Sequence, residues 1–252
     1  MKRLLVTLIA MLSLAGCGKK GALIPPEAMA PAPIGDLQTA QRGEAFYISW
    51  SAPTRDDAGR PLPDLAGFMI YRREVLPPAE DCEECPTAYH LIKSVDAEYL
   101  QNTFRSDSRF FFIDADLKAD VTYQFKAISV KKDGIESGPS NRARRKKAAP
   151  PTATTLKAVS TPTSILLEWQ PVTPPGNGKV EGYHIYRKQR GDACFPLQPL
   201  TGTPLNGVRY EDLGQERGVR YLYGVRTVAR IDGELVESPI SNEAEGALTQ
   251  PE

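Results

Sequence analysis

The pair of residues with the greatest capacity for chemistry in this sequence is Cys82 and Cys85, which enclose two glutamates. They lie in a proline-rich stretch, residues 75–89, that we expect to be a long loop. Cysteines at this spacing can form a local disulfide, act as a redox pair or supply two ligands to a metal ion. We predict the disulfide, and a redox or metal role stays the alternative. Closing so short a loop removes little chain entropy, so the predicted gain in stability is modest.

Few other residues could complete a catalytic or metal site. A haem attachment needs a histidine directly after the second cysteine, where Pro86 stands. A thioredoxin-type pair needs the start of a helix in an α/β fold. A zinc site would have to draw on His90, His184 and Cys194. Since no catalytic triad or glycine-rich phosphate loop is indicated either, we predict no enzymatic activity, no cofactor and no metal site.

A fourth cysteine, Cys17, follows a short apolar segment at the N-terminus. Lys2 and Arg3 are the only charges before it, and residues 4–15 are almost wholly apolar. That run is too short to span a bilayer, which takes about 20 residues, and is typical of a signal peptide. The sequence Leu-Ala-Gly-Cys at 14–17 resembles the bacterial lipobox. This resemblance implies cleavage before Cys17 and acylation of its thiol.

On this resemblance, residues 1–16 are a lipoprotein signal peptide and residues 17–34 a lipidated, proline-rich tether. Two or more acyl chains, palmitate among them, would hold Cys17 firmly in a membrane. Gly18 stands where an aspartate would favour retention at the inner membrane, so we expect the outer membrane, with the protein facing the periplasm. The envelope permits disulfides, and Cys194 is either a free thiol or a partner of one of the two loop cysteines.

The ten residues from Cys17 also resemble the start of the LptM-type small lipoproteins. The matching positions are Cys17, Gly18, Lys20, Gly21, Leu23, Pro25 and Pro26, although Ala22 replaces a frequent proline and the proline pair comes one residue early. In that family the lipidated segment helps the outer-membrane lipopolysaccharide transport channel to assemble. The resemblance implies that this segment contacts an outer-membrane β-barrel.

Composition limits the classes of fold and partner. The chain has 252 residues, 41% of them hydrophobic, and a formal net charge of +0. A near-neutral chain has no general attraction to nucleic acid, and we expect no nucleic-acid partner. The 22 prolines and 20 glycines, with short apolar runs between them, favour an all-β chain of one large or two small domains.

The sequence repeats itself, and each copy alternates apolar and polar residues with the period of a half-buried strand. The landmarks that recur in the same order are Trp50 and Trp169, Tyr71-Arg72 and Tyr186-Arg187, Tyr123 and Tyr221, Gly134 and Gly233, and Ser140-Asn141 and Ser241-Asn242. We place the two domains at residues 35–148 and 149–248, joined across the basic and proline-bearing stretch 144–155.

These landmarks resemble the fibronectin type III module. The strand sequences "FMIYRR" and "YHIYRK", the paired "YQFKA" and "YLYGV", and the closing "SGPSN" and "SPISN" all fit. The resemblance implies two tandem immunoglobulin-like β-sandwiches with Trp50, Tyr123, Trp169 and Tyr221 in their cores. It also implies a tyrosine corner in each copy, with Leu117 six residues before Tyr123 and Leu213 eight before Tyr221, so that we expect the second corner to be longer.

Three smaller features have two possible interpretations each. His184 alternates with two apolar neighbours and is expected to face solvent. The basic run 142–147 is interpreted as a charged edge strand, with a contact to anionic lipid or glycan as the alternative. Arg190-Gly191-Asp192 is interpreted as a chance match to an integrin motif, and Asp56-Asp57 as a solvated loop rather than a calcium site.

The sequence therefore predicts a lipoprotein, anchored in the outer membrane through Cys17, that acts as a non-catalytic spacer or interaction scaffold. Its partners would be the membrane and another envelope protein; the sequence does not fix its oligomeric state. One alternative is an envelope assembly factor whose lipidated end contacts a β-barrel. The other is a carbohydrate- or cell-wall-binding module.

Overall fold

The computed structural model describes residues 29–85 and 87–250. The predicted signal peptide, Cys17 and residues 17–28 of the tether lie outside this part of the chain. The described residues form strands and loops only, without an α-helix. No helix in residues 29–85 and 87–250 is long and apolar enough to cross a membrane.

The first module is a sandwich of two sheets. Its strands are β1 (Gln38–Arg42), β2 (Ala45–Ser51), β3 (Leu65–Glu74), β4 (His90–Asp96), β5 (Thr103–Ser106), β6 (Arg109–Asp114), β7 (Thr122–Lys131) and β8 (Ala143–Lys146). One sheet has the order β1-β2-β6-β5 and the other β4-β3-β7-β8, with every pairing inside the module antiparallel. This is the strand order of an immunoglobulin-type sandwich.

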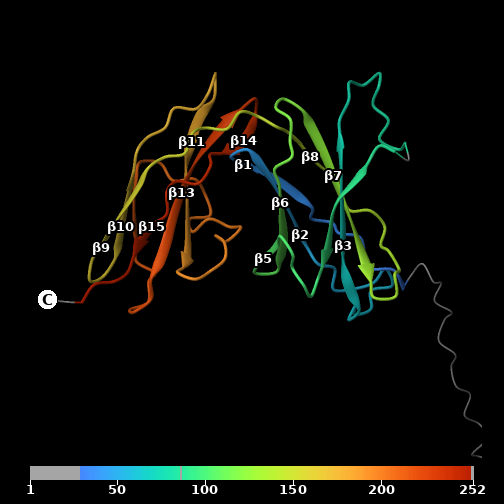
Figure 1. Ribbon diagram of the computed structural model, residues 1–252, viewed down its shortest axis with the longest axis horizontal. Helices are drawn as coiled ribbons and strands as arrows, with labels where there is room; N and C mark the ends of the chain where they lie inside the picture. The colour runs from blue at the N-terminus through green and yellow to red at the C-terminus, as the bar shows by residue number, and fades with distance from the viewer. Residues whose placement is uncertain (1–28, 86, 251–252) are drawn as a thin grey trace, which may run out of the picture.

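The second module repeats the plan. Its strands are β9 (Leu156–Ser160), β10 (Ile165–Trp169), β11 (Lys179–Gln189), β12 (Arg209–Asp212), β13 (Tyr221–Ile231), β14 (Glu234–Glu237) and β15 (Ala244–Gly246). Strands β12-β10-β9 form one layer, and β11-β13 with β14 and β15 form the other. The predicted fold, all-β with two tandem sandwiches, is confirmed (Figure 1).

The cores are built from the inward-facing residues of the alternating strands. Trp50, Tyr123, Trp169 and Tyr221 are all buried, at 5% exposure or less. In the first module Trp50 stacks on Phe110, with ring centroids 6.1 Å apart. Burial of aromatic side chains removes a large apolar area from water and is the main stabilising contribution to each sandwich.

The duplication extends to individual hydrogen bonds. The side chain of Asn141 bonds both the N–H and the C=O of Leu37, at 2.8 and 2.9 Å. Asn242 bonds both groups of Leu156 at the same two distances. Each asparagine lies just before the last strand of its module. It thus satisfies two backbone groups at the start of the same module.

The tyrosine corners have the same length in both modules, contrary to our expectation. The hydroxyl of Tyr123 accepts a hydrogen bond from the N–H of Lys118 at 2.8 Å, and that of Tyr221 accepts one from the N–H of Glu216 at 3.3 Å. In each case the donor lies five residues before the tyrosine. A backbone N–H closes the corner, so the position of the leucine does not set its length. The extra residues of the second copy lie upstream of the donor.

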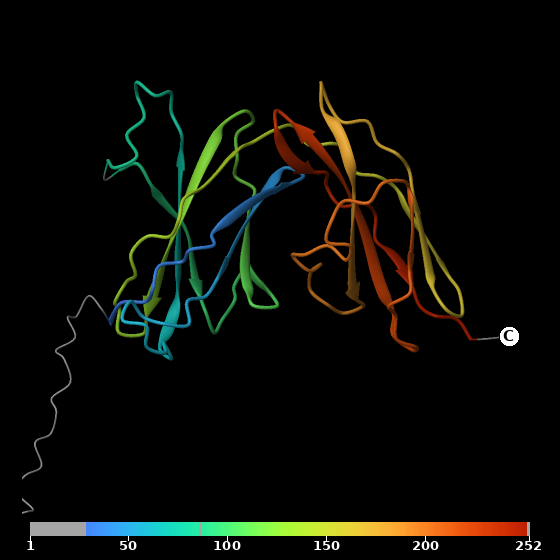
Figure 2. The same ribbon diagram turned by 180° about the vertical axis from the view of Figure 1, so that it is seen from behind.

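The two modules share a sheet edge. Strand β1 of the first module pairs in parallel with β14 of the second, with Gln41 opposite Val236 and Arg42 opposite Glu237. A single eight-stranded sheet therefore runs through both modules (Figures 1 and 2). The pairing covers two edge strands that would otherwise offer unpaired backbone groups to other chains.

The turn after β1 fits closely against the second module. Gly43 has φ +58°, and its N–H donates to the C=O of Glu237 at 2.8 Å. A Cβ at this position would lie 3.2 Å from Pro239. A glycine is needed here both for the left-handed conformation and for the close approach.

Replacing each corner tyrosine by phenylalanine should show how much each of the two hydrogen bonds contributes to the free energy of unfolding. We expect Tyr123→Phe to lower the free energy of unfolding by about 1 kcal/mol, since the part-buried hydrogen bond from the N–H of Lys118 is lost. Tyr221→Phe should cost less, because its bond is longer. Urea unfolding measures both, with the exposed Tyr99→Phe as the control; an equal or reversed order of the two variants would contradict this interpretation of the corners.

Candidate functional site

The predicted disulfide between Cys82 and Cys85 is present. It lies in the loop between β3 and β4, on the side of the first module that faces away from the second (Figures 1 and 2). Both cysteines are exposed at the surface. The loop is therefore a stapled projection at one end of the molecule.

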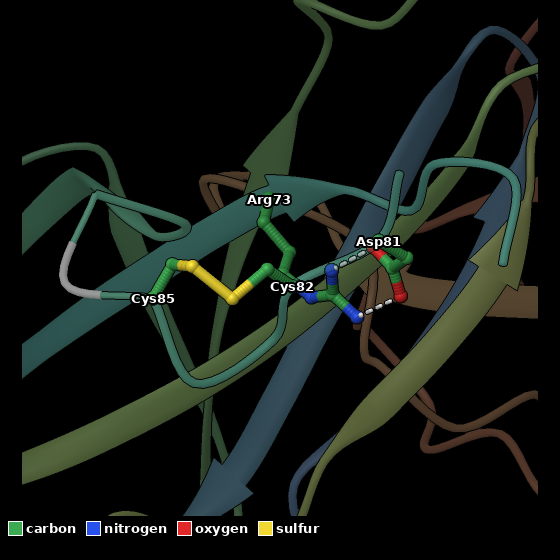
Figure 3. Close-up of a disulfide and its surroundings, with 4 residues drawn as sticks. All are labelled: Arg73, Asp81, Cys82 and Cys85. Carbon is green, nitrogen blue, oxygen red and sulfur yellow. Dashed lines mark hydrogen bonds and ion pairs between the residues drawn. A yellow bond between two sulfur atoms is a disulfide. The ribbon is translucent and has the colours of Figure 1, made fainter. Parts of the chain in front are cut away.

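A buried arginine holds this loop against the sheet. Arg73 points outward from β3, and its side chain is only 4% exposed. Its guanidinium donates two hydrogen bonds to the carboxylate of Asp81, at 2.5 and 3.1 Å (Figure 3). The hydrogen bond from Arg73 lowers the pKa of Asp81 against the effect of desolvation. A two-pronged pair of this kind fixes direction as well as distance.

A second attachment joins the loop to β7 and the end of the module. Glu83 accepts hydrogen bonds from Arg142 at 2.8 Å, from Gln124 at 2.9 Å and from the hydroxyl of Tyr89 at 3.2 Å. The ring of Tyr89 lies 4.1 Å from the ammonium of Lys126, a cation–π contact. The loop residues thus cover part of the outer face of the β4-β3-β7-β8 sheet.

These contacts favour a structural role for the disulfide. Two of the acidic residues beside the cysteines, Asp81 and Glu83, are engaged with arginines. Within residues 29–85 and 87–250 there is no group of three or more histidine, cysteine, aspartate or glutamate side chains placed to hold a metal ion. His90 lies exposed at the start of β4, and Asp56 pairs with Arg60 at 2.6 Å.

The basic run contributes to the contact between modules, which the sequence did not lead us to expect. Arg145 pairs with Glu234 at 3.2 Å and donates to the C=O of Leu235 at 2.9 Å. Lys146 pairs with Asp232 at 3.3 Å, also across the junction. Four of the six residues form strand β8, which pairs with β7. Most charges of the run are therefore neutralised within the protein, while Arg144 stays exposed.

The centre of the junction is a buried carboxylate, that of Glu237 at the end of β14. Its oxygens accept hydrogen bonds from the hydroxyl of Tyr186, at 2.9 and 3.0 Å, and contact Nδ1 of His184 at 2.8 Å. Nε of Arg42, from the first module, lies 3.1 Å away, and Nε of Arg226 lies 3.7 Å away. Since a carboxylate only accepts, the His184 tautomer at this contact carries its proton on Nδ1.

Burial and charge act in opposite directions on this carboxylate. Burial alone would raise the pKa of Glu237, but the hydrogen bond from His184 and the positive charges of Arg42 and Arg226 outweigh it, and the pKa is lowered. Burial beside Glu237 raises the pKa of Tyr186 far above its ordinary value. Glu237 is therefore ionised and Tyr186 neutral at neutral pH, as the hydrogen bonds require.

The prediction that His184 faces solvent is wrong. Its two strand neighbours Tyr183 and Ile185 do face the core, so the alternation was interpreted correctly. The opposite face of β11 is covered, however, and the His184 side chain is 15% exposed. Glu237 of β14 contacts His184 on this face, and Arg42 of the first module lies over the ring of Tyr186. The periodicity of a single strand does not reveal such contacts.

Two remaining sequence features lie in the connection after β11. Cys194 is a free, half-buried cysteine, and burial raises its pKa. In the Arg-Gly-Asp stretch, Arg190 pairs with Glu245 at 3.2 Å and Asp192 accepts a hydrogen bond from the N–H of Gln189 at 2.9 Å. Asp192 thus serves the local turn, and Arg190 pairs with β15.

Comparisons with known proteins add little beyond this architecture. No family model matches the chain. The chain is similar to a crystal structure of the FN1–FN3 domains of chicken CNTN1, with 18% sequence identity and a TM-score of 0.30, over 88% of this chain and 69% of that one. The fold assignment rests on the strand order and register described above.

Breaking the disulfide should matter less than breaking the arginine clamp. Closure of a loop this short contributes at most about 2 kcal/mol, so Cys82→Ser with Cys85→Ser should leave the loop in place. Arg73→Met should release it and make residues 75–89 sensitive to limited proteolysis. If the double serine variant is cleaved faster than Arg73→Met, the clamp is not what holds the loop.

The junction carboxylate should make stability depend on pH. A lowered pKa in the folded protein means that Glu237 contributes stability above its ordinary value of 4.5, which is lost as pH falls through the folded value. Glu237→Gln should lower the free energy of unfolding at pH 7 by about 3–5 kcal/mol, because it leaves buried arginines unpaired.

The difference between Glu237→Gln and the unmodified protein should shrink as the pH falls below 4. Urea unfolding between pH 3 and 7 measures it, with the exposed Glu211→Gln as the matched control. A difference that stays constant over this range would contradict the assignment of the charge to Glu237.

Proposed function

We propose that the chain is a lipoprotein, anchored in the outer membrane through Cys17, whose two sandwich modules act together as a non-catalytic interaction scaffold. The single observation that carries the proposal is the shared sheet: β1 and β14 unite the modules into one extended body. A spacer or scaffold needs a fixed relation between its ends, whereas modules on a free linker would not maintain one.

The positions of the chain start and of the loop between β3 and β4 support this proposal. The described part of the chain begins at one end of the first module, and the loop between β3 and β4 projects at the opposite end (Figures 1 and 2). A tether that joins residue 29 to a membrane would therefore leave the loop directed away from that membrane. Loops held by a rigid sandwich are common binding surfaces, so we assign partner contact to this loop.

Anchoring is tested by labelling the full chain with radioactive palmitate in a Gram-negative host. We expect incorporation that depends on Cys17 and recovery of the protein in the outer-membrane fraction. Cys17→Ala should abolish both, whereas Cys194→Ser should change neither. Labelling that survives in Cys17→Ala would contradict the anchor.

The scaffold role is tested by photo-crosslinking in the intact envelope, with a crosslinker at Glu80 in the exposed loop or at Val159 on β9. We expect discrete adducts with an envelope protein from Glu80 and few from Val159, which is 55% exposed but lies in the second module. Adducts from Val159 alone would place the binding surface elsewhere.

A second candidate function comes from the residues after Cys17, which resemble LptM-type lipoproteins. On this hypothesis the lipidated segment contacts an outer-membrane β-barrel and the modules extend from it. Affinity capture of the lipidated full chain should recover a β-barrel, and Leu23→Asp should abolish the recovery. Recovery of lipid alone would contradict this second candidate while leaving the scaffold unaffected.

A further inference from the structure

A small pocket opens between the modules beside Glu237 and the residues that contact its carboxylate. Its volume is about 240 Å³. One side is formed by β1, β2 and β6 of the first module, and the other by β11, β13 and the 193–196 segment of the second. The pocket therefore exists only while the modules are docked.

Positive charge exceeds negative charge around this pocket. Arg42, Arg226 and Lys188 line it, and their carboxylate partners are Glu237 and Glu243. Arg42 and Arg226 share Glu237, so three cations face two anions and the lining has an excess of positive charge. Partly buried positive charge that is only partly compensated favours the binding of an anion.

Arg42 and Arg226 also have N–H groups that make no hydrogen bond within the described residues. Arg42 donates through Nη2 to the C=O of Leu197 at 2.6 Å, and Arg226 through Nη1 to the C=O of Ser238 at 2.8 Å. Within residues 29–85 and 87–250, no hydrogen bond engages Nη1 of Arg42 or Nη2 of Arg226. Their side chains are only 9% and 10% exposed, so both guanidiniums are held in place.

Aromatic rings fix these guanidiniums and form the walls. Arg42 lies 4.8 Å from the ring centroid of Tyr47 and 5.1 Å from that of Tyr186, and Arg226 lies within 6 Å of both. The remaining wall is apolar, formed by Phe111, Ile113, Phe195, Pro196 and Ile240. The pocket thus combines planar cationic donors with an apolar surface.

We propose that this pocket binds a small organic carboxylate with an apolar body, the carboxylate facing Arg42 and Arg226. A guanidinium matches a carboxylate through paired N–H donors, and apolar walls favour a hydrocarbon group over inorganic anions. The site stands on the docked junction alone and does not rest on the proposed anchoring or scaffold function.

Isothermal titration of the detergent-purified full chain with benzoate tests the site. We expect saturable binding of one benzoate, with acetate and inorganic phosphate binding more weakly. Ile113 is 36% exposed at the pocket, so Ile113→Glu should fold and place its own carboxylate there. This variant should bind benzoate at least about tenfold more weakly, the value of one charged hydrogen bond.

The matched control is Val159→Glu, an exposed β-branched position on β9, which should bind benzoate normally. Arg226→Lys keeps the charge but loses the paired donors, and should weaken binding as well. Benzoate binding that is absent, or unchanged in Ile113→Glu, overturns the proposal. Phosphate binding as tight as benzoate overturns the assignment to a carboxylate with an apolar body.

Cys194 provides a second readout at the same pocket. Bound benzoate should slow alkylation of its thiol by N-ethylmaleimide, followed on the Cys194 peptide by mass spectrometry. The protection should be lost in Ile113→Glu and kept in Val159→Glu. Protection that is equal in both variants overturns binding at this place.

Discussion

The contact between Glu237 and Arg42 is the interaction on which the arrangement of this protein depends. These residues face each other where β14 of the second module pairs with β1 of the first. The pairing sets how the two sandwiches meet, and the pocket beside the junction follows from it. Each module has its own core, but the relation between the modules rests on this one edge.

The contacts at the junction select one way for the modules to dock more than they strengthen the docking. Its apolar part is a small cluster of Ala148, Ala229, Ile231 and Val236. A buried ion pair contributes little net stability once desolvation is included, but leaving one of its charges unpaired is costly. The modules therefore dock in one register, in which Glu237 meets its arginines, and other registers are penalised. The excess positive charge left over by this arrangement is what makes the neighbouring pocket a candidate for an anion.

Much of the fold could be predicted from the sequence because it depends on local signals. Alternating apolar residues predict the strands, and the ordered repeat of Trp50 and Trp169 predicts two sandwiches. The Cys82–Cys85 disulfide follows from spacing. The second tyrosine corner was predicted too long, because counting from Leu213 ignores which backbone N–H reaches the hydroxyl. The signal peptide and Cys17 remain predictions from the N-terminal residues.

The junction could not be predicted in the same way. Glu237 corresponds to Glu136 of the first copy, which is exposed, so residue type alone does not distinguish a buried carboxylate from a solvated one. One signal was present: the hairpin region 232–242 is longer than its counterpart 133–141. Which edge meets which is decided by the fit of whole modules, and a single sequence does not encode that in any short motif.

The modules are joined through backbone as well as side chains, and amide hydrogen exchange at Gly43 tests this joint most directly. This N–H belongs to a hairpin turn and donates across the junction to the C=O of Glu237 at 2.8 Å. We expect protection comparable to that of the interior amides of β2, because exchange requires the modules to separate. Exchange at the rate of an exposed turn, in a folded protein at neutral pH, would contradict it.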